Sequence, residues 1–167
     1  MNVPLINRTI SILYRYGQRF FAQKLKSCSL PLEVGQIPFL LPIYKIPGIT
    51  QDGISAHSVM DKGTTARAVK ELEKSGLIIR KTDEKDRRIN HIFPTQKALD
   101  IKDEVFLIIQ ELHEVLYQGL SEEEIDKAIS LLRSMQSNID DYLGQQTLPH
   151  QAPSSKTGDP ACKGGLI

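Results

Sequence analysis

The segment Asp61-Lys-Gly-Thr-Thr-Ala-Arg-Ala-Val-Lys-Glu-Leu-Glu-Lys-Ser-Gly76 runs directly into Leu77-Ile-Ile-Arg-Lys-Thr-Asp-Glu-Lys-Asp-Arg-Arg-Ile-Asn-His-Ile-Phe93. Asp61 can cap a helix at its N-terminus, and Gly76 is suited to end it. Val69 and Leu72 are spaced so that both face a core. Five polar residues stay mostly outside that core: Lys62, Thr64, Thr65, Arg67 and Lys70. The pattern predicts an amphipathic helix followed by a β-hairpin.

The hairpin is read as two short strands, Leu77 to Lys81 and Arg88 to Phe93, joined by a tip too charged to lie in a core. From Asp61 to His91 there are nine basic and six acidic residues, although the whole chain has a net charge of only +1. From Lys97 to Leu143 there are four basic and eleven acidic residues. This asymmetry favours a polyanionic partner for the middle of the chain alone.

Composition points to one main helical domain. The chain has 167 residues, 40% of them hydrophobic, with 6% aromatics and no tryptophan, which suits a core packed from Leu and Ile. The longest apolar stretches, Ile37 to Tyr44 and Val105 to Ile109, fall short of the about 18 residues that a membrane span needs. We therefore expect a soluble, cytoplasmic protein without a membrane segment. Cys28 and Cys162 are interpreted as two unrelated free thiols, with a smaller weight on a redox role for Cys28.

Helices are predicted on the N-terminal side of the capped segment. From Pro4 to Leu25, apolar residues recur at helical spacing. A second helix over residues 32–45 contains Pro38 and Pro42, so we expect a late start or a kink. Thr50 can cap a short third helix that ends at about Ser55.

Two further helices are predicted on the C-terminal side. Thr95 opens a long helix that ends near Gly119, and Ser121 with Glu124 forms a capping box for a last helix ending at about Leu143. The apolar stripe of the last helix suggests burial against the first helix and against a second subunit, which predicts a homodimer. From residue 144 onward the sequence is loop-like, and we expect a disordered tail.

Four pieces in this order resemble the MarR family of bacterial winged helix-turn-helix regulators: Pro47 to Gln51, Asp61 to Arg67, Leu72 to Ile78, and Asp86-Arg87-Arg88 with Thr95 seven positions on. The resemblance spans roughly residues 30–143. His91 and Pro94 depart from it, because these strand positions are usually apolar in the family.

The resemblance implies a mainly α fold with a small β-hairpin wing, in which a winged helix-turn-helix lobe is carried on a helical dimerisation region. The expected domains are an N-terminal dimerisation helix (residues 1–30), the DNA-binding lobe (31–95), C-terminal dimerisation helices (96–143) and the tail (144–167).

DNA-contacting roles are expected for the outer face of the capped helix and for the wing. If the first half of the helix enters the major groove, Lys62, Thr64, Thr65 and Arg67 can reach base edges, with Lys70 on the same outer face. The resemblance assigns Arg88 to the flanking minor groove and gives Asp86 a structural role, that of holding the wing by a salt bridge. By position, Lys85 and Arg87 are then phosphate-backbone contacts.

Other candidate sites are weaker. The resemblance implies a small aromatic or anionic effector, and Tyr14 and Arg15 lie on the helix that would line its cleft, although interface or surface roles are favoured for both. His113 between Glu111 and Glu114 is interpreted as solvated surface, so no metal or other cofactor is expected. His57 and His91 border the DNA-facing parts, and each is read either as a phosphate contact or as an ordinary exposed histidine.

The preferred hypothesis is a homodimeric transcription regulator that binds a pseudo-palindromic site in double-stranded DNA. Repression relieved by a small molecule is the usual outcome in the family, and the sequence does not choose between repression and activation. The alternative is a winged-helix protein-interaction module whose basic face serves an acidic partner. An enzyme is the weakest alternative, because the sequence shows no nucleophile and base pair, phosphate loop or metal cluster.

Overall fold

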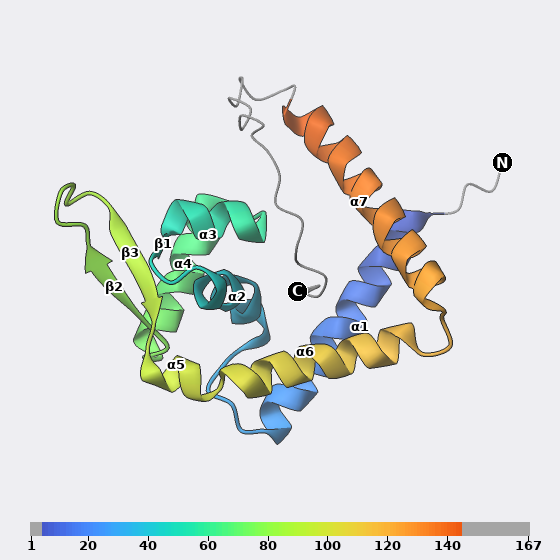
Figure 1. The fold of residues 1–167 in the computed structure, drawn as a ribbon, viewed down its shortest axis with the longest axis horizontal. Helices are drawn as coiled ribbons and strands as arrows, with labels where there is room; N and C mark the ends of the chain where they lie inside the picture. The colour runs from blue at the N-terminus through green and yellow to red at the C-terminus, as the bar shows by residue number, and fades with distance from the viewer. Residues whose placement is uncertain (1–4, 145–167) are drawn as a thin grey trace. The chain divides into compact units, whose positions relative to one another are not determined.

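The computed structural model describes residues 5–144 (Figure 1), and the chain divides after residue 118 into two units that are described in turn. Within the described residues, no helix has both the length and the apolar character needed to cross a membrane. The fold is mainly helical with one small antiparallel sheet, and the predicted fold class is confirmed. The tail beyond residue 144 and Cys162 lie outside the described residues.

The first unit begins with the elements α1 (Ile6–Ser27), η1 (Val34–Gln36) and α2 (Ile37–Lys45). The late start expected for the second helix is confirmed, because Pro38 lies in the first turn of α2, where its missing N–H costs nothing. Pro42 lies inside α2 and leaves the carbonyl of Pro38 without its usual donor four residues on. The Ser58 hydroxyl donates to that carbonyl at 2.9 Å. The proline therefore fits inside the helix because a later segment supplies the lost hydrogen bond.

The helix-turn-helix is formed by α3 (Gln51–Ser58) and α4 (Lys62–Lys74). The Thr50 side chain caps α3 by accepting from the Gly53 N–H at 3.2 Å, as expected. The predicted end of this helix at about Ser55 was wrong, because α3 continues to Ser58. Val59 then ends it in the left-handed backbone region.

A three-stranded antiparallel sheet contains the predicted hairpin and one strand that the sequence did not reveal. β2 (Ile78–Thr82) pairs with β3 (Asn90–Pro94), and the two-residue strand β1 (Ile49–Thr50) pairs with the other edge of β3. The β2–β3 hairpin projects away from the helices (Figure 1). It is the wing of the lobe.

The single long helix expected after Thr95 is two helices, α5 (Gln96–Asp100) and α6 (Lys102–Tyr117). Thr95 caps α5 as predicted, accepting from the Ala98 N–H at 3.3 Å. The break at Ile101 coincides with a hydrogen bond from the Tyr44 hydroxyl to the Ala98 carbonyl, 2.7 Å long. In a continuous helix that carbonyl would accept from the Lys102 N–H. A contact from α2 therefore accompanies the break between α5 and α6.

The core of the first unit lies where α2, α3 and α4 meet the sheet. Its fully buried side chains include Leu40, Ile43, Ile54, Leu72 and Ile92. They come from four different elements, so the core fixes the helix-turn-helix to the base of the wing.

The second unit contains α7 (Glu122–Gly144). The predicted capping box is confirmed, because Glu124 Oε2 accepts from the Ser121 N–H at 2.8 Å and the Ser121 hydroxyl accepts from the Glu124 N–H at 3.3 Å. No residue of α7 is buried. The helix keeps an apolar stripe that the described residues of its own unit, up to residue 144, leave uncovered.

Candidate nucleic-acid interface

The N-terminus of α4 is held by a chain of side-chain hydrogen bonds. Asp61 Oδ1 accepts from the Thr64 N–H at 2.8 Å, and Asp61 Oδ2 accepts from the Thr64 hydroxyl at 2.6 Å. The Thr64 oxygen also accepts from Arg67 Nη2 at 3.3 Å. The Thr64 hydroxyl, followed by the Thr64 N–H, lowers the pKa of Asp61. The cap therefore stays ionised at neutral pH and holds Thr64 and Arg67 in place before any partner binds.

Thr65 does not belong to the exposed face, and the expectation that it reaches base edges was wrong. Its side chain is 0% exposed, and its hydroxyl donates to the Asp61 carbonyl at 3.0 Å. Thr65, Val69 and Leu72 are the three buried residues of α4, spaced four and then three positions apart. The spacing that identified Val69 and Leu72 as core therefore includes Thr65 as well.

The other residues predicted on α4 lie outside the core. Lys62, Arg67 and Lys70 are exposed, and Thr64 is half-buried. Lys62 forms an ion pair with Asp52 of α3, with Nζ and Oδ1 3.1 Å apart. Both side chains of this pair are largely exposed, so it contributes little stability and can open for another anion.

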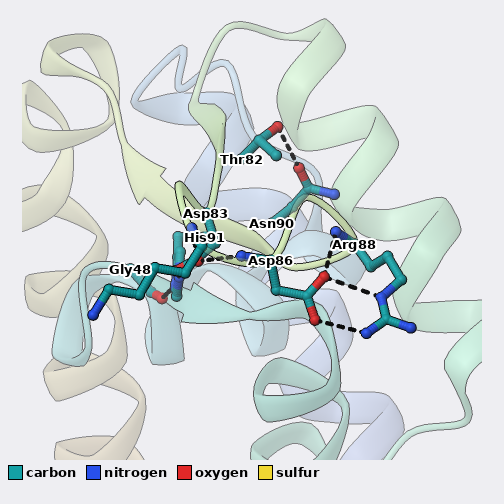
Figure 2. Close-up of polar contacts among 8 residues, drawn as sticks. Gly48, Thr82, Asp83, Asp86, Arg88, Asn90 and His91 are labelled. Atoms are coloured by element: carbon teal, nitrogen blue, oxygen red, sulfur yellow. Dashed lines mark hydrogen bonds and ion pairs between the residues drawn. The ribbon is translucent and has the colours of Figure 1, made fainter.

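The tip of the wing is organised by two aspartates (Figure 2). Asp83 Oδ1 accepts from the backbone N–H groups of Lys85 and Asp86 at 2.8 and 2.9 Å. Asp86 in turn accepts from the Arg88 backbone N–H and, with both carboxylate oxygens, from the Arg88 guanidinium, each bond 3.0 Å long. The Arg88 guanidinium is the main cause of the lowered pKa of Asp86. The pair fixes the direction in which the arginine leaves the hairpin.

Arg88 keeps hydrogen-bonding capacity despite this pair. Its side chain is 90% exposed, and the contact with Asp86 uses its Nε–H and one N–H of Nη2. A guanidinium carries five N–H donors, so three remain. Lys85 and Arg87 are also exposed at the tip. Together these side chains present cationic groups on one short loop.

An open hollow of about 410 Å³ lies between the wing and the start of α3. It carries two arginines, Arg80 and Arg88, and one carboxylate, Asp52. Arg80 is held by Glu73 of α4, with Nε and Oε2 3.1 Å apart. The remaining lining residues are polar or apolar side chains of β1, α3 and the wing: Thr50, Gln51, Ile89, Asn90 and Ile92.

His91 has a role that the sequence did not reveal. It is half-buried, with Nδ1 2.8 Å from the Gly48 carbonyl and Nε2 3.0 Å from Asp83 Oδ2. The reading of His91 as an ordinary exposed histidine was wrong. Gly48 lies 43 residues earlier in the chain. His91 and Gly48 come together because β1 pairs with β3. The local sequence gave no signal that predicted β1.

Tyr14 and Arg15 lie on an open part of α1. Tyr14 is 64% exposed, and Arg15 Nη1 donates to the Ser11 hydroxyl on its own helix at 2.9 Å. The hollow that borders the C-terminal end of α1 is lined by Leu25, Leu30, Leu32 and neighbouring residues, without Tyr14 or Arg15. The structure therefore does not bring this pair into that hollow.

The remaining metal and thiol candidates do not form a site in the part of the chain that the structure describes. Residues 5–144 contain no group of three or more His, Cys, Asp or Glu side chains placed to hold a metal ion. Cys28 is exposed, and a hydrogen bond with Glu104 raises the pKa of its thiol. A raised pKa disfavours the reactive thiolate.

Comparison with known proteins gives a consistent result. The model of the MarR family matches residues 32–89. YybA of Bacillus subtilis (strain 168), an uncharacterised HTH-type transcriptional regulator, is 33% identical over 111 residues, which are 66% of this chain and 74% of the relative.

Solved structures share the fold over most of the chain. A MarR transcriptional regulator from Methanosarcina mazei Go1 is 33% identical with a TM-score of 0.72, and the match covers 83% of this chain and 99% of that one. A structure from Listeria monocytogenes, described as a MarR family transcriptional regulator complexed with a 26-mer DNA, is 27% identical with a TM-score of 0.76. That match covers 92% of this chain and 100% of the other.

Proposed function

Because the chain belongs to the MarR family of transcriptional regulators, we propose that it binds a specific site in double-stranded DNA with α4 in the major groove and the wing over the flanking minor groove. The observation that carries this proposal is a pair of exposed arginines, one on each of these two elements. Arg67 on α4 and Arg88 on the wing are both exposed, and each is oriented by an aspartate-centred network.

Base reading is assigned to Thr64 and Arg67, with Lys62 and Lys70 beside them. An arginine can donate two hydrogen bonds to the major-groove edge of guanine, and a threonine can offer both its hydroxyl and its methyl group. Arg67 contacts Thr64 through a long bond of 3.3 Å, which a base can replace at little cost. Thr65 is not part of the reading face, because it is buried.

The wing supplies electrostatic attraction and orientation. The three free donors of Arg88 can enter a narrow minor groove, where A·T-rich sequence strengthens the negative potential. Lys85 and Arg87 at the tip are placed to contact phosphates. The hollow between the wing and α3 gives a phosphate access to Arg80 and Arg88 together.

A homodimer is supported by apolar surface on both terminal helices. Leu13 of α1 and Leu132 and Ile139 of α7 belong to a larger set of apolar side chains that are exposed in the single chain. A second copy covering these faces would present two α4 helices to a pseudo-palindromic site, with half-sites about one helical turn apart.

Regulation by a small molecule is the outcome proposed for this dimer, with repression relieved by an aromatic or anionic effector. Tyr14 and Arg15 offer an aromatic ring and a cation at consecutive positions of α1, and both are exposed. Such a regulator would work in the cytoplasm, where it meets the DNA.

The test is selection of bound duplexes from a random-sequence pool by the purified protein, followed by sequencing of the retained DNA. The proposal expects enrichment of an inverted repeat whose half-sites are about one helical turn apart. Retention without enrichment of any sequence would reduce the function to nonspecific DNA binding. Failure to retain duplex at low salt would overturn it.

A further inference from the structure

We propose that His91 is a positioning residue for DNA binding: its doubly protonated ring ties the wing tip to the body of the lobe, and duplex binding weakens when the ring loses a proton. The inference rests on the proposed function and adds to it a regulation by pH. It follows from the two groups that the imidazole faces and from what those groups hold.

Both ring nitrogens of His91 face acceptors (Figure 2). The Gly48 carbonyl lies 2.8 Å from Nδ1 and has no proton to give, so Nδ1 must donate. The Asp83 carboxylate lies 3.0 Å from Nε2, and an ionised carboxylate also only accepts. Neutral imidazole has one N–H and satisfies one of these acceptors. Only the imidazolium satisfies both.

The two acceptors belong to segments that matter for the wing. Asp83 uses its other oxygen, Oδ1, to hold the backbone N–H groups of Lys85 and Asp86, and Asp86 holds Arg88. On the other side, the Gly48 N–H donates to the Ile92 carbonyl at 2.8 Å, which fixes the turn before β1 against β3. His91 therefore connects the turn that leads into the helix-turn-helix with the loop that aims Arg88.

Among the groups around the His91 ring, the Asp83 carboxylate is the main charged partner. Across the ladder, His91 is opposite Lys81 on β2 and the uncharged Thr50 on β1. The Lys81 ammonium lies over the Phe93 ring, 5.1 Å from its centroid. The opposing charge is the Asp83 carboxylate, which faces Nε2 directly.

The pKa values agree with this geometry. Backbone hydrogen bonding from Asp86, followed by the contact with His91, lowers the pKa of Asp83 to about 2, so this carboxylate is ionised at neutral pH. The Gly48 carbonyl, followed by Asp83, raises the pKa of His91. The clamp is therefore complete below the unfolded pKa of about 6.5 and is lost as the pH rises through the folded pKa of His91.

The first measurement is a nitrogen-15 NMR titration of the histidine rings in the free, full-length protein from about pH 5.5 to about pH 9. The expected result is that both nitrogens of His91 carry protons at the acidic end, and that the amide signals of Lys85 and Asp86 shift when the ring is deprotonated. A neutral His91 ring at about pH 6 would overturn the proposal. The proposal would also fail if the amide signals of Lys85 and Asp86 did not shift as the His91 ring titrates.

The second measurement is affinity for a random-sequence duplex pool over the same pH range. The parent protein is expected to bind at least about 5-fold more weakly at the basic end. Asp83→Asn is the decisive variant, because its amide keeps an oxygen for the two backbone N–H groups and can offer an N–H to neutral Nε2. The neutral ring then completes the clamp, so this variant should bind with nearly constant affinity across the range.

Two controls separate the clamp from other causes. His57→Asn removes an exposed histidine of α3 and should keep the pH dependence of the parent. His91→Asn should bind weakly at every pH while remaining folded by circular dichroism. An Asp83→Asn profile as steep as that of the parent would overturn the inference. If the parent fails to bind duplex at any pH, the proposed function fails, while the NMR titration still decides whether the ring controls the wing.

Discussion

Val59, in the turn between α3 and α4, is β-branched and yet has a left-handed backbone, with φ 51° and ψ 43°. This region costs an L-residue about 1–2 kcal/mol, and more crowding is expected for a branched Cβ. The Val59 side chain is 75% exposed, so burial does not offset the strain. The turn keeps its shape because α3 and α4 are both fixed to the core.

Val59→Gly should raise the free energy of unfolding by about 0.5–1 kcal/mol, since relief of strain exceeds the added entropy of glycine. Thermal or urea unfolding measures the change. The matched control is Ala56→Gly on α3, where the backbone is helical and glycine should destabilise by about 1 kcal/mol. If both variants lose stability alike, the left-handed strain at Val59 is not real.

At the residue scale, the sequence correctly predicted the role of side chains whose partners lie close by in the chain. Asp61, Thr50 and Thr95 were predicted as caps because a cap bonds within three residues of itself. The exposure of Thr65 was misjudged because its polarity was weighted above its place in the buried stripe. The contacts of His91 were missed because they depend on strand register.

At the element scale, α2 and α3 depend on each other through one side chain. Pro42 removes the donor that would satisfy the Pro38 carbonyl, and Ser58 supplies a replacement at 2.9 Å. The sequence predicted the late start of α2 from its prolines, but the rescue by Ser58 is 20 residues away in the chain. Contacts between residues far apart in the chain also explain why the sequence did not predict β1 or the break at Ile101. At that break, Tyr44 bonds to Ala98, 54 residues later in the chain.

Ser58→Ala should lower the free energy of unfolding by about 1 kcal/mol, because it leaves a partly buried carbonyl without a donor. Ser134→Ala on α7 is the control, since its hydroxyl bonds an exposed carbonyl of its own helix and its loss should change stability by less than about 0.5 kcal/mol. Chemical unfolding of the two variants gives the comparison. An equal, negligible effect would mean that solvent satisfies Pro38 as well as Ser58 does.

At the scale of the whole molecule, α7 has an apolar stripe and no buried residue. Leu132→Glu should convert a dimer at micromolar concentration into a monomer and lower the melting temperature, because the charge would enter an apolar interface. Sedimentation velocity measures the assembly. Arg133→Gln, a polar neighbour on the same helix, should leave it unchanged. A stable, helical monomer of the parent protein would end the dimer proposal.

The overall architecture was accessible from the sequence because its signals are redundant. Helical periodicity, three threonine or aspartate caps and a charged hairpin all agree on a winged helix-turn-helix lobe, and each is local. The assembly and any effector depend on surfaces that residues 5–144 leave open, such as the α7 stripe and the Tyr14 and Arg15 pair. Local sequence patterns identify such surfaces, but they do not predict which partner or ligand covers them.

The central claim is that α4 reads sequence while the wing adds general affinity, and salt titration of two variants tests it most directly. Arg67→Ala should lose about 1–3 kcal/mol on the selected site and little on random duplex, which blurs preference at one base position. Arg88→Ala should weaken both duplexes by similar factors, lose more where the flank is A·T-rich, and reduce the salt slope by about one unit. Circular dichroism checks that both remain folded. If folded Arg88→Ala binds every duplex as the parent does, the wing does not engage DNA and the account is contradicted.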